Sequence, residues 1–174
     1  TVSYDDPHAE LELPTYKKIS ARCAGSPFEI DDVEISTIEK SQGGGKKEIR
    51  IPSTKDSIEV ELSHAKFHSK TITVGRGEGT NGKVEVELEP KTGEVEINTE
   101  VDNIPSPNTE VLLEPQADTA KYVSDETVST DDSGSVTVDK LIGNYTVTHK
   151  NTSTQQYYSV QTQSIQVRYK DWTK

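Results

Sequence analysis

DDSGSVTVDKLIGNYTVTH, residues 131–149, is the stretch of sequence that decides the fold. Val136 and Val138 alternate with polar residues, so their side chains point to one face of an expected strand. That strand ends at Leu141, where the chain turns. The alternation therefore predicts the first strand of a β-hairpin.

The second strand of this hairpin follows Gly143, which allows a tight reversal of the chain. Tyr145 and Val147 place the apolar face of that strand on the same core. A tyrosine directly after such a turn buries its ring and satisfies its hydroxyl group on nearby backbone, as in the tyrosine corners of sandwiches. We therefore expect a hairpin of a small antiparallel β-sandwich.

Alternating apolar residues predict strands on both sides of Pro90. In the first half the predicted strands are Ile19–Ala24, Val33–Ile38, Glu48–Ile51, Ile58–Leu62, Lys70–Val74 and Val84–Leu88. In the second half the last five of these are matched, in order, by Thr109–Leu113, Ser135–Val138, Tyr145–His149, Ser159–Gln163 and Ile165–Tyr169. A repeat of about 80 residues has the length of tandem domains rather than of a solenoid unit.

The predicted fold class is all-β, with two tandem antiparallel Ig-like sandwiches and a short N-terminal arm. The arm covers residues 1–15, the first sandwich 16–90 and the second 91–174. Only Pro90-Lys91-Thr92-Gly93 joins the sandwiches, and so short a linker predicts a fairly stiff two-domain rod.

The chain is acidic, with 30 acidic against 19 basic side chains and a formal net charge of −11. This charge repels phosphate backbones and anionic membranes, so we expect no nucleic-acid partner and no membrane insertion. Three interpretations remain open: solubility of an exposed sheet surface, attraction to cations or to a basic partner, and adaptation to salty surroundings. The lone Cys23 excludes an intrachain disulfide and is expected to be a small buried residue on the first strand.

Two motifs of the second half carry a family resemblance. Residues 130–138, TDDSGSVTV, and residues 141–147, LIGNYTV, look like the Thr-Asp-x-x-Gly strand and the Leu-x-x-Gly-x-Tyr-x-Val turn of transthyretin-like (prealbumin-like) sandwiches. This family includes carboxypeptidase regulatory domains, CnaB repeats and PEGA domains. The resemblance implies a spacer, adhesin stalk or accessory domain. The first half departs from the pattern, because its hairpin at residues 55–60 lacks the glycine and the tyrosine.

The sequence holds no arrangement typical of catalysis, and we expect the protein not to be an enzyme. His64 and His68 are four residues apart but lie between strands rather than on a helix, so we expect surface or turn histidines. Cys23 has no local nucleophile signature, and no Gly-x-Ser-x-Gly motif is present. No cofactor is expected. Calcium is the open alternative, with Asp131 and Asp132 as weak candidate ligands in a sequence that turn chemistry also explains.

Three sets of residues are candidates for contacts with other molecules. In the arm, Ala9, Leu11 and Leu13 alternate with glutamates, which predicts either a loosely held segment or a strand lent to a neighbouring subunit. The aromatic residues Tyr157, Tyr158 and Trp172 are candidates for stacking on a sugar. The glycosylation triplets begin at Asn144 and Asn151.

The hypothesis that follows is a non-enzymatic structural or adhesive module that acts through protein–protein contacts, with neighbouring copies in an assembly or with other proteins. The expected setting is extracellular, on a cell surface, a filament or a virion surface. The alternative is an accessory module that binds carbohydrate or calcium through loops at one sandwich end, such as Gln116–Asp125 or Lys150–Tyr158.

Overall fold

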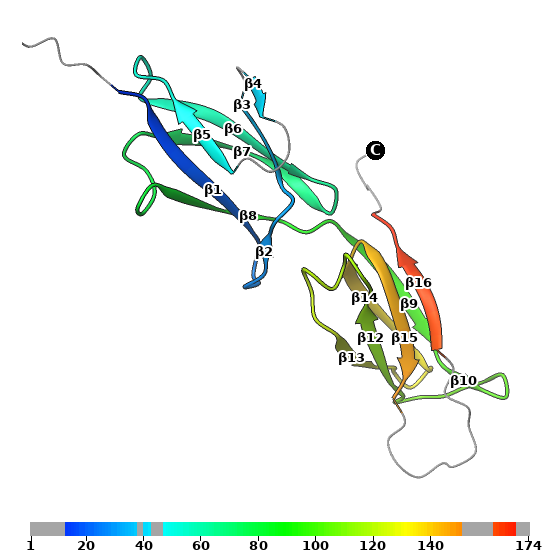
Figure 1. The fold of residues 1–174 in the computed structure, drawn as a ribbon. Coiled ribbons are helices and arrows are strands. Elements are labelled where there is room, and N and C mark those ends of the chain that lie inside the picture. Colours follow the sequence, from blue (N-terminus) through cyan, green and yellow to red (C-terminus); the bar gives the residue numbers. More distant parts are fainter. Residues whose placement is uncertain (1–12, 38–39, 43–46, 151–161, 170–174) are drawn as a thin grey trace, which may run out of the picture. The chain divides into compact units, whose positions relative to one another are not determined.

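A computed structural model describes residues 13–37, 40–42, 47–150 and 162–169 of the chain. In this part of the chain all regular elements are strands, which confirms the prediction of an all-β fold (Figure 1). Among the described residues there is no helix with the length and apolarity needed to cross a membrane. Contacts divide the chain into two compact units. The first comprises Thr1–Ala21, Asp31–His64 and Ser69–Glu87, and the second Arg22–Ile30, Ala65–His68 and Leu88–Lys174.

Sixteen strands follow one another along the described residues. Up to residue 88 they are β1 (Thr15–Cys23), β2 (Glu29–Ile30), β3 (Glu34–Thr37), β4 (Lys40–Gln42), β5 (Glu48–Ile51), β6 (Ser57–His64), β7 (Phe67–Gly75) and β8 (Lys83–Leu88). The others are β9 (Thr92–Asn98), β10 (Glu100–Val101), β11 (Ile104–Pro105), β12 (Glu110–Pro115), β13 (Glu126–Ser129), β14 (Ser135–Leu141), β15 (Gly143–His149) and β16 (Thr162–Val167).

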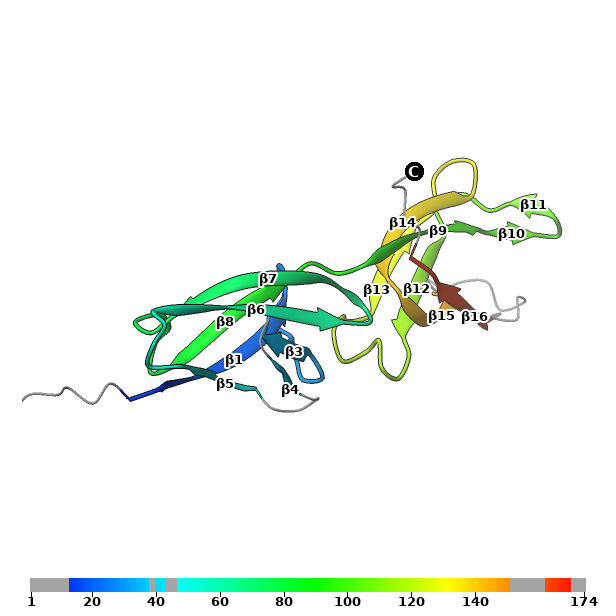
Figure 2. The same cartoon turned by 90° about the horizontal axis from the view of Figure 1, so that it is seen from above.

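The strands before residue 90 form two four-stranded sheets. In one sheet β1 pairs with β2 and β5 along one edge and with β8 along the other (Figure 1). Figure 2 shows β1 with β5 and β8 beside it. In the second sheet the order is β4-β3-β6-β7. The apolar residues that alternate along these strands are buried between the sheets, as the period of two requires. The buried apolar residues of the first unit are Ile19, Ala21, Val33, Ile35, Ile49, Ile51, Val60, Leu62, Val74 and Val86.

Both backbone edges of β1 are hydrogen-bonded. On one side Ile19 N donates to Lys47 O just before β5, at 2.6 Å. On the other side Lys18 N donates to Gly82 O at 2.8 Å, and Ala24 N donates to Leu88 O at 3.0 Å. From the first of the last two bonds to the second, the residue number rises on both strands, so β8 runs parallel to β1. The other strand pairs of known register are antiparallel.

The strands after residue 90 form a second pair of sheets. One has the order β13-β12-β15-β16, and the other consists of β14 and β9 alone. A short hairpin of β10 and β11 extends from the end of β9. The buried core shared by these sheets consists of Ile97, Val111, Leu113, Tyr145 and Val167.

The predicted hairpin at residues 131–149 is confirmed as β14 and β15. Gly143 opens β15, and a Cβ atom at this position would lie 2.0 Å from the hydroxyl oxygen of Thr119, so the chain needs glycine here. Tyr145 is 2% exposed, and its hydroxyl group donates a hydrogen bond to Leu141 O at 3.0 Å. Burial, followed by the charge of Glu126, raises the pKa of Tyr145 to about 12. The predicted tyrosine corner is therefore present.

Three predictions about single strands are wrong. No strand was predicted between Asp118 and Thr130, but this segment contains β13, which pairs with β12. No strand was predicted at Ile104–Pro105 either, because its prolines disfavour regular pairing, but it pairs with Glu100–Val101 in a hairpin, where an edge strand tolerates proline. The repeat alignment also fails at its end: Ile165 belongs to β16, which pairs with β15 as β7 pairs with β6, and not to a counterpart of β8.

The predicted role of Cys23 is confirmed. The residue ends β1 and is buried, with 4% of its surface exposed. Burial, followed by the charge of Glu89, raises the pKa of its thiol, which favours the neutral form. It behaves as a small apolar core residue.

Candidate functional site

The most distinctive surface of the second unit is one edge of β9. Strand β9 pairs with β14 from Thr92 opposite Leu141 to Asn98 opposite Ser135. Two hydrogen bonds frame this ladder, from Ile142 N to Lys91 O at 2.9 Å and from Thr99 N to Gly134 O at 2.8 Å. Hydrogen-bonded and non-hydrogen-bonded pairs alternate along an antiparallel ladder. The residues joined by these two bonds form hydrogen-bonded pairs, so the ladder pairs next to them, Thr92–Leu141 and Asn98–Ser135, are non-hydrogen-bonded.

The alternation fixes where each backbone group of β9 points. Gly93, Val95 and Ile97 direct their N–H and C=O groups to β14. Thr92, Glu94, Glu96 and Asn98 direct theirs to the opposite edge. Within the described ranges no strand pairs with that edge. We call this row the β9 edge, defined by Thr92, Glu94, Glu96 and Asn98.

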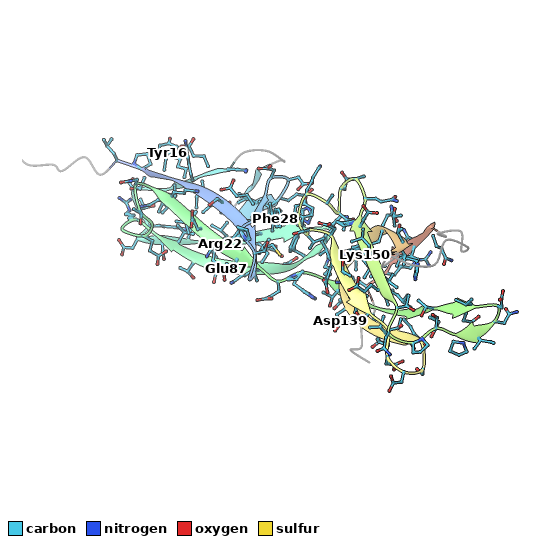
Figure 3. The ribbon with its side chains drawn as sticks, turned by 90° about the horizontal axis from the view of Figure 1, so that it is seen from below. Tyr16, Arg22, Phe28, Glu87, Asp139 and Lys150 are labelled. Carbon is cyan, nitrogen blue, oxygen red and sulfur yellow. The ribbon has the colours of Figure 1, made fainter. Side chains whose placement is uncertain are left out.

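The exposed face of the β9–β14 sheet is acidic. Glu94 and Glu96 are exposed on β9. Asp139, labelled in Figure 3, is exposed on β14 and is the ladder partner of Glu94. In a non-hydrogen-bonded pair the side chains lie close, so these two carboxylates repel each other. Among the exposed side chains of the two strands, the structure shows no basic residue.

The β9 edge is bounded at both ends. At its start Gly93 admits the backbone of the chain after β16, because a Cβ atom on Gly93 would lie 2.2 Å from Arg168 O. Past its end the hydroxyl group of Thr99 donates to Ser106 O at 2.7 Å, and the buried Thr130 hydroxyl also bonds Ser106 O at 3.2 Å. These contacts position both ends of β9.

Asp131 and Asp132 were the candidate calcium ligands. One carboxylate oxygen of Asp131 accepts hydrogen bonds from Ser133 N at 2.8 Å, Ser133 Oγ at 2.6 Å and Ser135 N at 3.0 Å. The bonds from the Ser133 hydroxyl and the Ser135 amide lower the pKa of Asp131. This is the turn geometry that the sequence also allowed. Over the described ranges no group of three potential metal ligands comes together, and calcium binding stays an untested prediction.

The candidate sugar-binding aromatics Tyr157, Tyr158 and Trp172 lie outside the described residues. The loop Gln116–Asp125, which was expected to bind a ligand, is described. Its Tyr122 is 3% exposed and therefore offers no open ring face to a sugar.

Of the remaining predicted contact residues, some lie within the described residues and some lie outside them. Ala9 and Leu11 lie outside the described residues, whereas Leu13 is 67% exposed just before β1. Asn144 is exposed on β15, and Asn151 is outside the described part. The arm and the glycosylation triplets remain predictions.

Surface or turn histidines were predicted, and His64 directly precedes the turn between β6 and β7. Its side chain at the end of β6 is 6% exposed, and Nε2 lies 3.1 Å from the Asp32 carboxylate. His68 is exposed on the next strand, β7. The two residues therefore lie on adjacent strands rather than on one helical face.

The β9 edge was not found from the sequence. The alternation of Val95 and Ile97 with Glu94 and Glu96 indicates a strand with one apolar and one acidic face. Whether an edge is paired depends on strands distant in sequence, and alternation carries no information on that. The one signal present in the sequence was the pair of glutamates, Glu94 and Glu96, with no basic residue among the other positions of β9.

No family model and no curated protein matches the chain. Among solved structures, the chain is similar to the Bacillus anthracis TIE protein, with a TM-score of 0.53 and 13% sequence identity. The match covers 90% of this chain and 32% of that structure, so the chain spans about a third of its length. At this identity the similarity shows the fold alone.

Proposed function

We propose that this chain is a non-enzymatic structural or adhesive module that contacts other polypeptides. The observation that carries the proposal is the β9 edge. A row of four residues, Thr92, Glu94, Glu96 and Asn98, turns backbone donors and acceptors away from β14, toward an edge with which no strand of the described residues pairs. Such an edge is a template for pairing with another chain.

The surroundings of the edge support this role. The strand is fixed on its other side by β14 along its whole length, so it needs no rearrangement to receive a further strand. A setting outside the cell, on a cell or virion surface, belongs to the same proposal, and the exposed position of Asn144 within its glycosylation triplet is compatible with it. Membership of the transthyretin-like family is likewise proposed, on the residues of the 130–147 motifs.

A selection of peptides from a displayed random library tests the proposed function. We expect selected peptides to lose binding when Glu96→Pro removes an edge N–H, because the ladder to β14 does not use that group. The matched control is Thr137→Pro, which removes an N–H on the outer edge of β14. Failure to select any peptide, or equal binding to both variants, would refute the proposal.

A further inference from the structure

We propose that the partner strand of the β9 edge is an extended basic segment of another polypeptide, with apolar residues at alternate positions and Lys or Arg between them. This inference rests on the proposed function and names the chemistry of its partner. It follows from the charge of the edge and from a comparison with the edge of β1 that is already filled.

In the first sheet, the edge of β1 that pairs with β8 allows the exposed charges of two neighbouring strands to be compared. On β1 the exposed side chains beside β8 include Lys18 and Arg22. On β8 the exposed side chains are Lys83, Glu85 and Glu87. The two glutamates give β8 a net negative charge beside the basic residues of β1, which cross-strand pairing favours, although the hydrogen bond from Lys18 N to Gly82 O places Lys18 next to Lys83.

In the two-stranded sheet, β9 carries the opposite charge on its exposed face. Glu94 and Glu96 replace the basic residues, and Asp139 on the far side adds a third carboxylate. An added strand places its outward side chains beside Glu94 and Glu96, since neighbouring residues of paired strands share a face. Lys or Arg at those positions neutralises the repulsion, whereas Glu or Asp increases it.

The inward side of the added strand must be apolar. Val95 is half-buried on the core side of β9, and Ile97 is 8% exposed, so apolar side chains beside them extend the core. An alternating apolar and basic segment meets both demands. The arm of a second copy meets only the apolar one, because Glu10 and Glu12 would lie beside the glutamates of the edge.

Two synthetic peptides test the charge of the partner. One alternates valine and lysine and spans Glu94 to Asn98, and the other is the arm sequence of residues 8–14, which carries Glu10 and Glu12. We expect the basic peptide to bind at least about tenfold more tightly in isothermal titration calorimetry, with the difference shrinking at high salt. In the variant Glu94→Lys/Glu96→Lys this preference should be reversed, while the matched variant Glu59→Lys/Glu61→Lys on β6 should keep it.

The outcomes separate this inference from the proposed function. Equal binding of both peptides, still abolished by Glu96→Pro, would refute the basic partner and leave edge pairing intact. Tighter binding of the arm peptide would refute it in favour of a second copy of the chain. A large gain in binding of the basic peptide after deletion of residues 169–174 would identify the chain's own basic end as the occupant and refute an external one.

Discussion

Strands β1 and β9 each open one half of the chain, and they differ in how many neighbours they have. β1 is paired along both edges, by β5 and β2 on one side and by β8 on the other. β9 is paired along one edge only, by β14, within the part of the chain that the structure describes. The same position in two similar sheets is thus an interior strand in one case and an edge strand in the other. Edge position, rather than strand sequence, separates a structural element from a binding surface.

The exposed side chains of β1 and β9 also differ in charge. The exposed residues Lys18 and Arg22 of β1 lie beside β8, whose exposed residues are Lys83, Glu85 and Glu87. The exposed residues Glu94 and Glu96 of β9 lie beside Asp139, which has the same sign of charge. Among the described residues, the acidic face of β9 therefore has no cross-strand partner of opposite charge, whereas the basic residues of β1 lie beside a strand with two exposed glutamates.

The largest expected effect comes from proline substitutions at comparable positions of the two strands. Lys18→Pro removes an N–H that donates to Gly82 O at 2.8 Å, and we expect it to lower the free energy of unfolding by roughly 2–4 kcal/mol. Glu96→Pro removes an N–H that faces the open edge, and we expect a loss below about 1 kcal/mol. Denaturant titration followed by circular dichroism measures both. Equal losses would show that the β9 edge is paired after all.

The next effect concerns Gly93, where the β9 edge begins. Gly93→Val places side-chain atoms on the backbone of Arg168, and we expect it to destabilise the second unit by about 2–3 kcal/mol. Gly77 is the control, because a Cβ there has nothing within 4 Å. If Gly77→Val were as costly in thermal denaturation, the close approach at Gly93 would not explain the loss.

A smaller effect is expected at the tyrosine corner, which closes the second unit and has no counterpart in the first hairpin. Tyr145→Phe removes the hydrogen bond to Leu141 O and should cost about 1 kcal/mol at neutral pH. Because folding raises the pKa of Tyr145 to about 12, its contribution is fully present below about pH 10 and is lost as the pH rises toward 12. The wild-type chain should therefore lose about 2 kcal/mol more than the variant over that range. Parallel pH profiles of unfolding free energy would contradict the assignment.

The contrast between the two strands also explains what the sequence could and could not predict. The hairpin of β14 and β15 was predictable because its turn, its alternation and its tyrosine are all local in sequence. The alternation at Ile165 and Val167 correctly indicated a strand, but it did not say which strand lies beside it, so the residues were matched to β8 instead of β7. β13 was missed because it is mostly exposed and carries no apolar alternation. For the same reason the β9 edge was invisible: it is defined by pairing, which is non-local.

The smallest effect tests the charge argument at a single residue pair. Glu94 lies directly opposite Asp139 in a non-hydrogen-bonded pair, so Glu94→Lys should raise the free energy of unfolding by about 0.5 kcal/mol at low salt. The matched cycle adds Asp139→Asn to both backgrounds. If the gain comes from pairing with Asp139, it should largely disappear in the Asp139→Asn background and at high ionic strength. A gain that persists in both conditions would come from the lysine itself, and the acidic face of β9 would then give no reason to expect a basic partner.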